Sequence, residues 1–209
     1  MKNKNLIIGA ATGYNKRDLY YFVESLRKVY NEKVIFIVND TLDEETNHYF
    51  NVNQIDIFLT KSSPRTIFKD RYKIYRKIIE NHDRVGKVMI SDTKDVIFQS
   101  DPFKHQNFYK LNFFLEDKRI VDCNTNSKWI NRAYGSKVYE NIKNENISCS
   151  GVTIGDRLEI LNYTEEMTKQ IKNNKYYSLN PFNKGSDQGN HNVLVNLPDN
   201  KGKLFRRYS

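Results

Sequence analysis

The first sixty residues alternate short apolar runs with amphipathic or polar stretches. The apolar runs at 6–11, 33–38 and 55–59 have the length and composition of buried strands. Between the first two runs, apolar residues recur at helical spacing, namely Leu19, Phe22, Val23, Leu26 and Tyr30. Because strands that alternate with helices are typical of a parallel, doubly wound sheet, the pattern predicts an α/β fold.

A second amphipathic helix is predicted over residues 67–79. Its apolar residues occupy one broad face at 3.6 residues per turn. Arg71 lies in the middle of that face, where a guanidinium needs an anionic partner. Two interpretations are open: Arg71 binds a phosphate or carboxylate ligand, or it forms a structural ion pair with a buried acid.

The next apolar strand, residues 87–90, leads directly into two carboxylates, Asp92 and Asp95. In α/β proteins, ligands bind in the crevice beyond the carboxyl ends of the strands. Carboxylates placed there can hold a hard divalent cation, Mn²⁺ or Mg²⁺, against a phosphate-bearing substrate. The segment therefore indicates a metal-dependent enzyme that acts on a phosphorylated compound.

The second half of the chain has a less regular pattern. We expect strands at 113–116 and 147–154, helix around 129–142, and a further helix that Asp156 caps and that runs to about 171. No internal repeat or low-complexity linker divides the sequence. A single domain over residues 1–209 is therefore predicted, and 38% hydrophobic content with 13% aromatic residues is enough for its core.

Composition also bears on location and partners. The longest apolar runs, at 34–38 and 111–115, are far too short to span a bilayer, so no membrane span is expected. Cys123 and Cys149 are too few for a disulfide framework or a zinc site, which favours free thiols in the cytoplasm. The abrupt basic segment 203–208 leaves open one further interpretation, in which the chain is cut from a longer polypeptide that has further domains.

The formal net charge of +9 invites a nucleic-acid function, because lysine and arginine neutralise phosphates. However, the lysines are spread along the whole chain, and no nucleic-acid-binding motif accompanies them. We therefore expect no nucleic-acid partner. The basic excess instead favours a diphosphate ligand.

Four motifs occur in an order that is specific although each alone is weak: Ala10-Ala11-Thr12-Gly13-Tyr14, Ser91-Asp92-Thr93-Lys94-Asp95 followed by Asp101-Pro102-Phe103, Ser148-Cys149-Ser150-Gly151-Val152, and Ser186-Asp187-Gln188. With them the chain resembles the GT-A glycosyltransferases over nearly its whole length. These metal-dependent enzymes transfer a sugar from a nucleotide diphosphate to an acceptor hydroxyl. The resemblance implies a Rossmann-like, mixed but mainly parallel sheet flanked by helices. A nucleotide-binding half would span about 1–100, and a sugar and acceptor half about 101–209.

The resemblance also implies which residues bind the nucleotide. Tyr14 would stack on the uracil ring of a UDP-sugar donor, while Ala10 and Thr12 offer hydrogen bonds. Further contacts to the base, ribose or phosphates would come from Asn39, Asp40, Arg71 and Asp92.

The metal ligands depart from the family pattern, because Asp92 and Asp95 are three residues apart. Asp95 matches the second acid of the family's Asp-x-Asp motif, Thr93 takes the place of the first, and Asp92 either fills that vacancy or holds the ribose. His191, one turn beyond Asp187, is a further candidate ligand of Mn²⁺ or Mg²⁺. Its alternative is a structural histidine.

On the sugar side, the resemblance implies that Ser150 and Gly151 pass close to the donor sugar, where glycine allows close backbone approach. Asp187 and Gln188 would lie beside the anomeric carbon and stabilise a cationic sugar, as in retaining members. Likeness to virus-encoded members implies transfer of a glucose- or rhamnose-type hexose to a capsid glycan in the host cytoplasm.

Two other functions compete. A sugar-phosphate nucleotidyltransferase shares the strand order and the metal, but its glycine-rich loop is not matched by residues 9–13. A non-catalytic module that binds nucleotide sugars or carbohydrate is the other alternative, with aromatic residues available for stacking on sugars at Trp129, Tyr134, Tyr176 and Tyr177.

Overall fold

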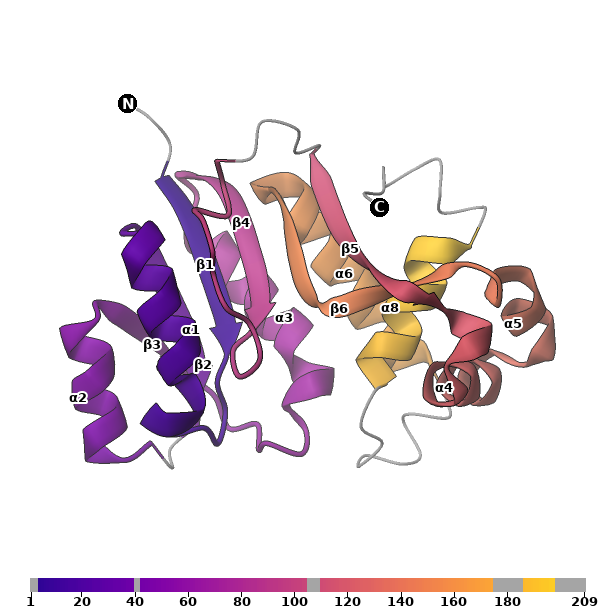
Figure 1. Ribbon diagram of the computed structural model, residues 1–209, viewed down its shortest axis with the longest axis horizontal. Helices are drawn as coiled ribbons and strands as arrows, with labels where there is room; N and C mark the ends of the chain where they lie inside the picture. The colour runs from indigo at the N-terminus through magenta and orange to yellow at the C-terminus, as the bar shows by residue number, and fades with distance from the viewer. Residues whose placement is uncertain (1–3, 40–41, 105–109, 175–185, 198–209) are drawn as a thin grey trace.

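The computed structural model describes residues 4–39, 42–104, 110–174 and 186–197. At its centre is a six-stranded sheet with the strand order β3-β2-β1-β4-β6-β5 (Figure 1). The strands are β1 (Lys4–Ala10), β2 (Lys33–Val38), β3 (Ile55–Leu59), β4 (Val85–Asp92), β5 (Leu111–Arg119) and β6 (Asn146–Asp156).

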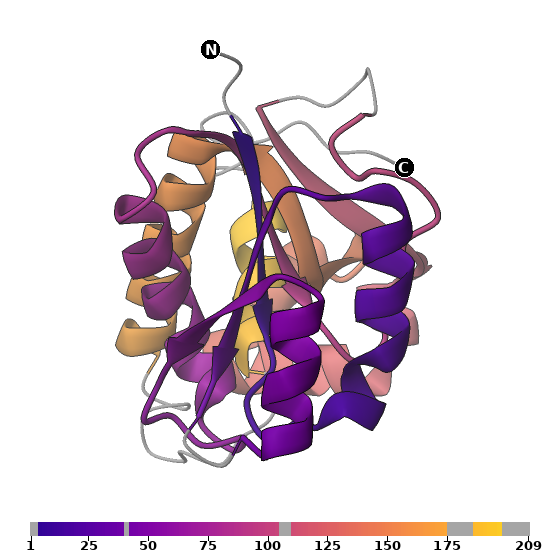
Figure 2. The same cartoon turned by 90° about the vertical axis from the view of Figure 1, so that its left-hand side faces the viewer.

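Helices cover both faces of this sheet. Figure 2 shows α3 and α6 on one side and α1 on the other, with α2 in front of the sheet. The helices are α1 (Lys16–Val29), α2 (Glu44–Val52), α3 (Ile67–Glu80), α4 (Asn124–Tyr134), α5 (Ser136–Ile142), α6 (Arg157–Asn173) and α8 (Ser186–Asn196), with a short 3₁₀ helix, η1 (Ile120–Asp122), before α4. The expected single α/β domain, a mixed sheet flanked by helices, is confirmed.

The expectation that the sheet is mainly parallel was wrong. β3, β2, β1 and β4 pair in parallel, but β6 is antiparallel to β4 and β5 is antiparallel to β6. The direction of β6 depends on which strand it pairs with, and hydrophobic periodicity carries no information about partners. The doubly wound arrangement therefore holds for the first four strands and ends after β4.

Alternate residues of β1 explain the two main cores. Leu6 and Ile8 point into a cluster with residues of α3, α6 and α8, whereas Ile7 points into a cluster with residues of α1 and α2. This is the period-two alternation of a strand that is covered on both faces. A third, smaller cluster holds α4 and α5 against the start of β6 through Ile130, Ile142 and Ile147.

Local signals fix several helix ends. Asn15 and Asp18 form a capping box at the start of α1. The sequence prediction missed α2, which has few apolar positions but is capped by Asp43. The predicted helix over 129–142 is divided into α4 and α5 by Gly135, whose φ is 81°. Asp156 stands at the N-cap of α6 as expected, but its side chain makes no capping hydrogen bond there.

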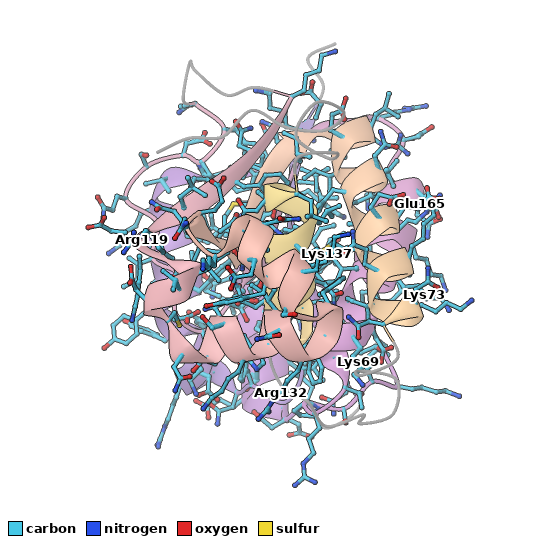
Figure 3. The ribbon with its side chains drawn as sticks, turned by 90° about the vertical axis from the view of Figure 1, so that its right-hand side faces the viewer. Lys69, Lys73, Arg119, Arg132, Lys137 and Glu165 are labelled. Carbon is cyan, nitrogen blue, oxygen red and sulfur yellow. The ribbon has the colours of Figure 1, made fainter. Side chains whose placement is uncertain are left out.

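The basic excess is distributed over the surface. Figure 3 shows Lys69, Lys73, Arg119, Arg132 and Lys137 on one face together with Glu165; these residues come from α3, β5, α4, α5 and α6. None of the helices described is long and apolar enough to cross a membrane.

Candidate functional site

The order of the strands reverses at β1, which lies between β2 and β4. The chain moves outward from β1 to β3 on one side and then returns to place β4 on the other side. In the register of these pairs, Ala10 lies opposite both Ile37 of β2 and Asp92 of β4. The carboxyl ends of three parallel strands therefore meet at one edge, which is where open α/β sheets bind ligands.

The loop after β1 is fixed against the end of β2. The buried Thr12 hydroxyl donates to a carbonyl of β2 at 3.3 Å, and the amide of Gly13 donates to Asn39 Oδ1 at 3.2 Å. Gly13 has a φ of 78°, and a Cβ built there would come within 2.3 Å of Pro64, so only glycine fits this turn. The turn presents the half-buried Tyr14 at the sheet edge.

Tyr14 lies close to the acids of this edge. Burial, followed by the negative charge of Asp92, raises the pKa of the Tyr14 hydroxyl, and Asp95 and Asp18 act in the same direction. The ammonium of Lys94 lies 5.4 Å from the centre of the Tyr14 ring. The end of β4 with its following loop and the first turn of α1 thus converge on this tyrosine.

Arg71 forms a bridge between two carboxylates. Its guanidinium lies 2.5 Å from Asp92 Oδ1 and 2.5 Å from Asp187 Oδ2, and the side chains of Arg71 and Asp187 are only 8% and 9% exposed. Its Nε is buried with no hydrogen-bond partner among the described residues. Of the two interpretations of Arg71, the arrangement is that of a structural ion pair with a buried acid. It also links β4 to the first turn of α8.

The two carboxylates differ in their surroundings. Asp187 is almost completely buried, and this desolvation raises its pKa, although Arg71 opposes the shift. The Asp92 side chain is 42% exposed. Arg71 contacts Oδ1 of this carboxylate. Within the described ranges, the other oxygen, Oδ2, makes no hydrogen bond or ion pair. Asp92 therefore keeps one oxygen available to a ligand.

β6 separates from β4 next to Asp92. Their pairing ends at Ser91 and Val152, and the next residue of β6 is Gly151. A Cβ on Gly151 would lie 2.8 Å from Asp92 Oδ2, so a side chain at this position would displace the carboxylate oxygen. The carbonyl of Ser150 accepts a hydrogen bond of 3.4 Å from Arg71. The predicted sugar-side residues thus lie beside the predicted nucleotide-side residues.

Beyond this point the free edge of β6 is bonded by amide side chains of α8. Gln188 accepts from the Ser150 amide at 2.9 Å and donates to the Ser148 carbonyl at 2.7 Å. Asn192 accepts from the Ser148 amide at 2.9 Å and donates to its carbonyl at 3.2 Å. Both ends of the Gln188 amide are thus used by the backbone, which makes Gln188 a residue that holds α8, and with it Asp187, against the sheet.

His191 has the surroundings of a structural histidine, which was the alternative to a metal ligand. It is fully buried, its Nε2 bonds to Ser148 Oγ at 2.8 Å, and its Nδ1 bonds to the Tyr163 hydroxyl at 2.7 Å. Burial lowers the pKa of the imidazole to about 3. Because both ring nitrogens already have partners, His191 does not offer a lone pair to a cation in this arrangement, and the expectation of a metal ligand there is not supported.

The loop after β4 carries the remaining acid. Asp95 is exposed, whereas Thr93 is buried and donates its hydroxyl to the Ala10 carbonyl at 2.9 Å. Thr93 is therefore occupied in tying β4 to β1. Lys94 forms an ion pair of 2.7 Å with Asp18 in the first turn of α1.

The sequence prediction missed two residues of this site, Asp18 and Asn192. The capping position of Asp18 and the four-residue spacing of Gln188 and Asn192 were the signals that could have identified them.

The structure thus brings most predicted site residues to one edge of the sheet: Ala10, Thr12, Tyr14, Asn39, Arg71, Asp92, Ser150, Gly151, Asp187 and Gln188. Asp95 follows on the adjoining loop, and Asp40 lies outside the described residues. Within the described ranges, no group of three or more histidine, cysteine, aspartate and glutamate side chains is arranged to hold a metal ion.

Comparisons with known proteins add no relative to this picture: no protein-family model matches the chain, and no curated protein matches it significantly. The interpretation of the site therefore rests on its geometry and its charges.

Proposed function

We propose that this protein is a metal-dependent glycosyltransferase of the GT-A type, which transfers a hexose from a UDP-sugar to a hydroxyl of a glycan acceptor. The observation that carries the proposal is the position of Asp92. This carboxylate lies at the reversal point of the strand order, beside the aromatic Tyr14, with one oxygen facing Gly151. A flat ring, a carboxylate and an approachable backbone at a switch point suit a nucleotide joined to a sugar.

The charges of this edge favour a bound cation. Asp92, Asp95 and Asp187 all belong to it, and Arg71 is already shared by two of them. Lys94 is paired with Asp18. The site therefore carries an excess of negative charge, which would repel a diphosphate unless a cation lay between them.

Two carboxylates of this edge suit Mg²⁺ or Mn²⁺. The oxygens of Asp92 and Asp95 are hard ligands, and the former has an available Oδ2. Magnesium commonly binds through one or two carboxylates and completes its shell with water and substrate phosphates. A site with fewer than three protein ligands is consistent with that mode. When bound, such an ion supplies Lewis-acid stabilisation of the negative charge on the departing diphosphate.

The residues of the chain then have distinct tasks. Tyr14 stacks on the base, while Asn39 and Thr12 hold the loop that carries it. Gly151 leaves room for the sugar beside Asp92. Arg71 fixes Asp187 in its buried position, from which its charge stabilises a cationic sugar in a retaining transfer. Gln188 positions Asp187 through its two bonds to β6.

Release of UDP tests the proposal. The protein is incubated with UDP-glucose, UDP-rhamnose and UDP-galactose in Mn²⁺ and in EDTA, because transferases slowly hydrolyse their donors. We expect UDP release with at least one donor, loss of it in EDTA, and a decrease of about a hundredfold in Asp92→Asn. Asp117→Asn, an exposed acid of β5, is the matched control and should retain activity.

The alternatives give different products. A binding module would retain the UDP-sugar intact, and a nucleotidyltransferase would release pyrophosphate from UTP and a sugar phosphate. Absence of UDP release from every donor, with the protein folded and Mn²⁺ present, would contradict the assignment as a glycosyltransferase.

A further inference from the structure

Lys94 lies over the aromatic ring that the proposed nucleotide would use. Its Nζ is 5.4 Å from the centre of the Tyr14 ring and 2.7 Å from Asp18 Oδ1. The three residues come from different segments: the turn after β1, the first turn of α1 and the loop after β4. The contact is therefore a property of the folded site.

The position of Lys94 is set by the start of α1. Asp18 is the third residue of the capping box, and its Oδ2 accepts from the Asn15 amide at 3.3 Å. Its other oxygen, Oδ1, binds the lysine. Because the cap fixes Asp18, the ammonium of the exposed Lys94 is held over the Tyr14 ring, and Tyr14 itself packs against the core cluster that contains residues of α1.

This arrangement can be displaced by a ligand. The Lys94 side chain is 57% exposed and that of Asp18 is 26% exposed, and ion pairs and cation–π contacts at such exposure are weak. Lys94 also lies between Asp92 and Asp95, in the loop that follows β4 and next to the acids where the proposed diphosphate would bind.

We propose that Lys94 determines the specificity of the nucleotide site for phosphorylated ligands: without ligand its ammonium covers the Tyr14 ring, and on binding it leaves the ring and pairs with the phosphates. The inference rests on the proposed function, since it concerns the same site. On this proposal, an uncharged nucleoside competes with Lys94 for the Tyr14 ring. A diphosphate offsets the loss of the contact between Lys94 and the ring, because it forms a charge-assisted hydrogen bond with the ammonium.

The consequence is a pair of opposite effects in one variant. Lys94→Met keeps a long apolar side chain but removes the charge. Uridine, which no longer competes with the ammonium for the Tyr14 ring, should bind about threefold more tightly. UDP, which loses the ammonium, should bind about tenfold more weakly in the same Mn²⁺ buffer. Calorimetric titration of the full chain with both ligands measures the two dissociation constants.

Lys77→Met is the matched control. Lys77 is exposed and lies 5.7 Å from the centre of the Phe58 ring, so this variant also removes one charge and one cation–π contact, on α3. Its affinities for uridine and UDP should equal those of the wild type. Circular dichroism of all three proteins checks that the fold is unchanged.

The outcomes separate this inference from the function on which it rests. If the wild type binds UDP but Lys94→Met changes uridine and UDP affinity in the same direction, or leaves uridine affinity unchanged, the role of Lys94 is contradicted and the proposed function stands. If the wild type binds neither ligand in Mn²⁺, both proposals fail.

Discussion

At the scale of single residues, buried polar groups decide what the site can do. Arg71 is the centre of these groups, because it is buried and shared between Asp92 and Asp187. A buried ion pair adds little to stability relative to apolar residues, but removing one partner leaves the other charged and desolvated. Arg71 is therefore expected to be more important for keeping Asp187 in place than for binding a ligand.

This role predicts a large effect of Arg71→Met on stability. The variant should lose about 3–5 kcal/mol of unfolding free energy, measured in urea, because Asp187 remains buried without its partner. The double variant Arg71→Met/Asp187→Leu should recover at least half of that loss. Arg76→Met is the control: Arg76 is 37% exposed in its pairs with Glu80 and Glu165, and its loss should stay below about 1 kcal/mol. Equal losses for both arginines would contradict this account.

His191 gives stability a predictable dependence on pH. Burial lowers its pKa from 6.5 to about 3, so between these values the unfolded chain takes up the proton more readily than the folded one. The contribution of His191 to the free energy of unfolding is therefore fully present above pH 6.5 and decreases as the pH falls toward 3. The wild type should lose about 2 kcal/mol through His191 between pH 7.5 and pH 5.

Urea unfolding of His191→Asn across the same pH range checks this expectation. The variant should be less stable at pH 7.5 but should lack this part of the pH dependence, whereas His48→Asn, which removes an exposed histidine of α2, should keep it. A pH dependence in His191→Asn as steep as in the wild type would show that another group is responsible.

At the scale of elements, the absence of a side chain at Gly151 of β6 allows Asp92 Oδ2 to keep its position beside this strand. The Cβ of Gly151→Ala would lie 2.8 Å from Asp92 Oδ2, and the half-exposed carboxylate can move away. We expect folding to survive and the dissociation constant of UDP in Mn²⁺ to increase about tenfold, as when a ligating side chain loses its support.

Gly155→Ala, four residues further along the same strand, provides the contrast. Its Cβ would come within 2.5 Å of the Lys110 carbonyl, which is backbone and cannot move as freely. This variant should lose stability, measured in urea, while its folded fraction binds UDP normally. The assignment of Gly151 to the site fails if both variants change affinity by the same factor.

The elements also show what the sequence can and cannot predict. β1, β2, β3, α1 and α3 were predicted because hydrophobic periodicity is local. α2 was missed because its cap, rather than an apolar stripe, defines it. The direction of β6 depends on a pairing between distant segments. In the site, Asp92 and Arg71 were each identified, but not that they bind one another, since their contact spans 21 residues and requires the finished sheet.

At the scale of the whole molecule, charge is distributed unevenly. The chain carries a net charge of +9, and its lysines and arginines extend outward from several helices (Figure 3). The carboxylates of Asp92, Asp95 and Asp187 lie by contrast at the carboxyl edge of β4 and the adjoining start of α8. Under the proposed function, the basic surface would attract the anionic donor, and the acidic edge would need a cation to hold it.

The most direct test of this account is calorimetric titration of UDP into three samples: protein with Mn²⁺, protein stripped of metal, and the Asp92→Ala/Asp95→Ala variant with Mn²⁺. We predict binding in the first sample and affinities at least about tenfold weaker in the other two, because a diphosphate near uncompensated carboxylates is repelled. The same dissociation constant in all three samples would contradict a cation-dependent nucleotide site at the end of β4.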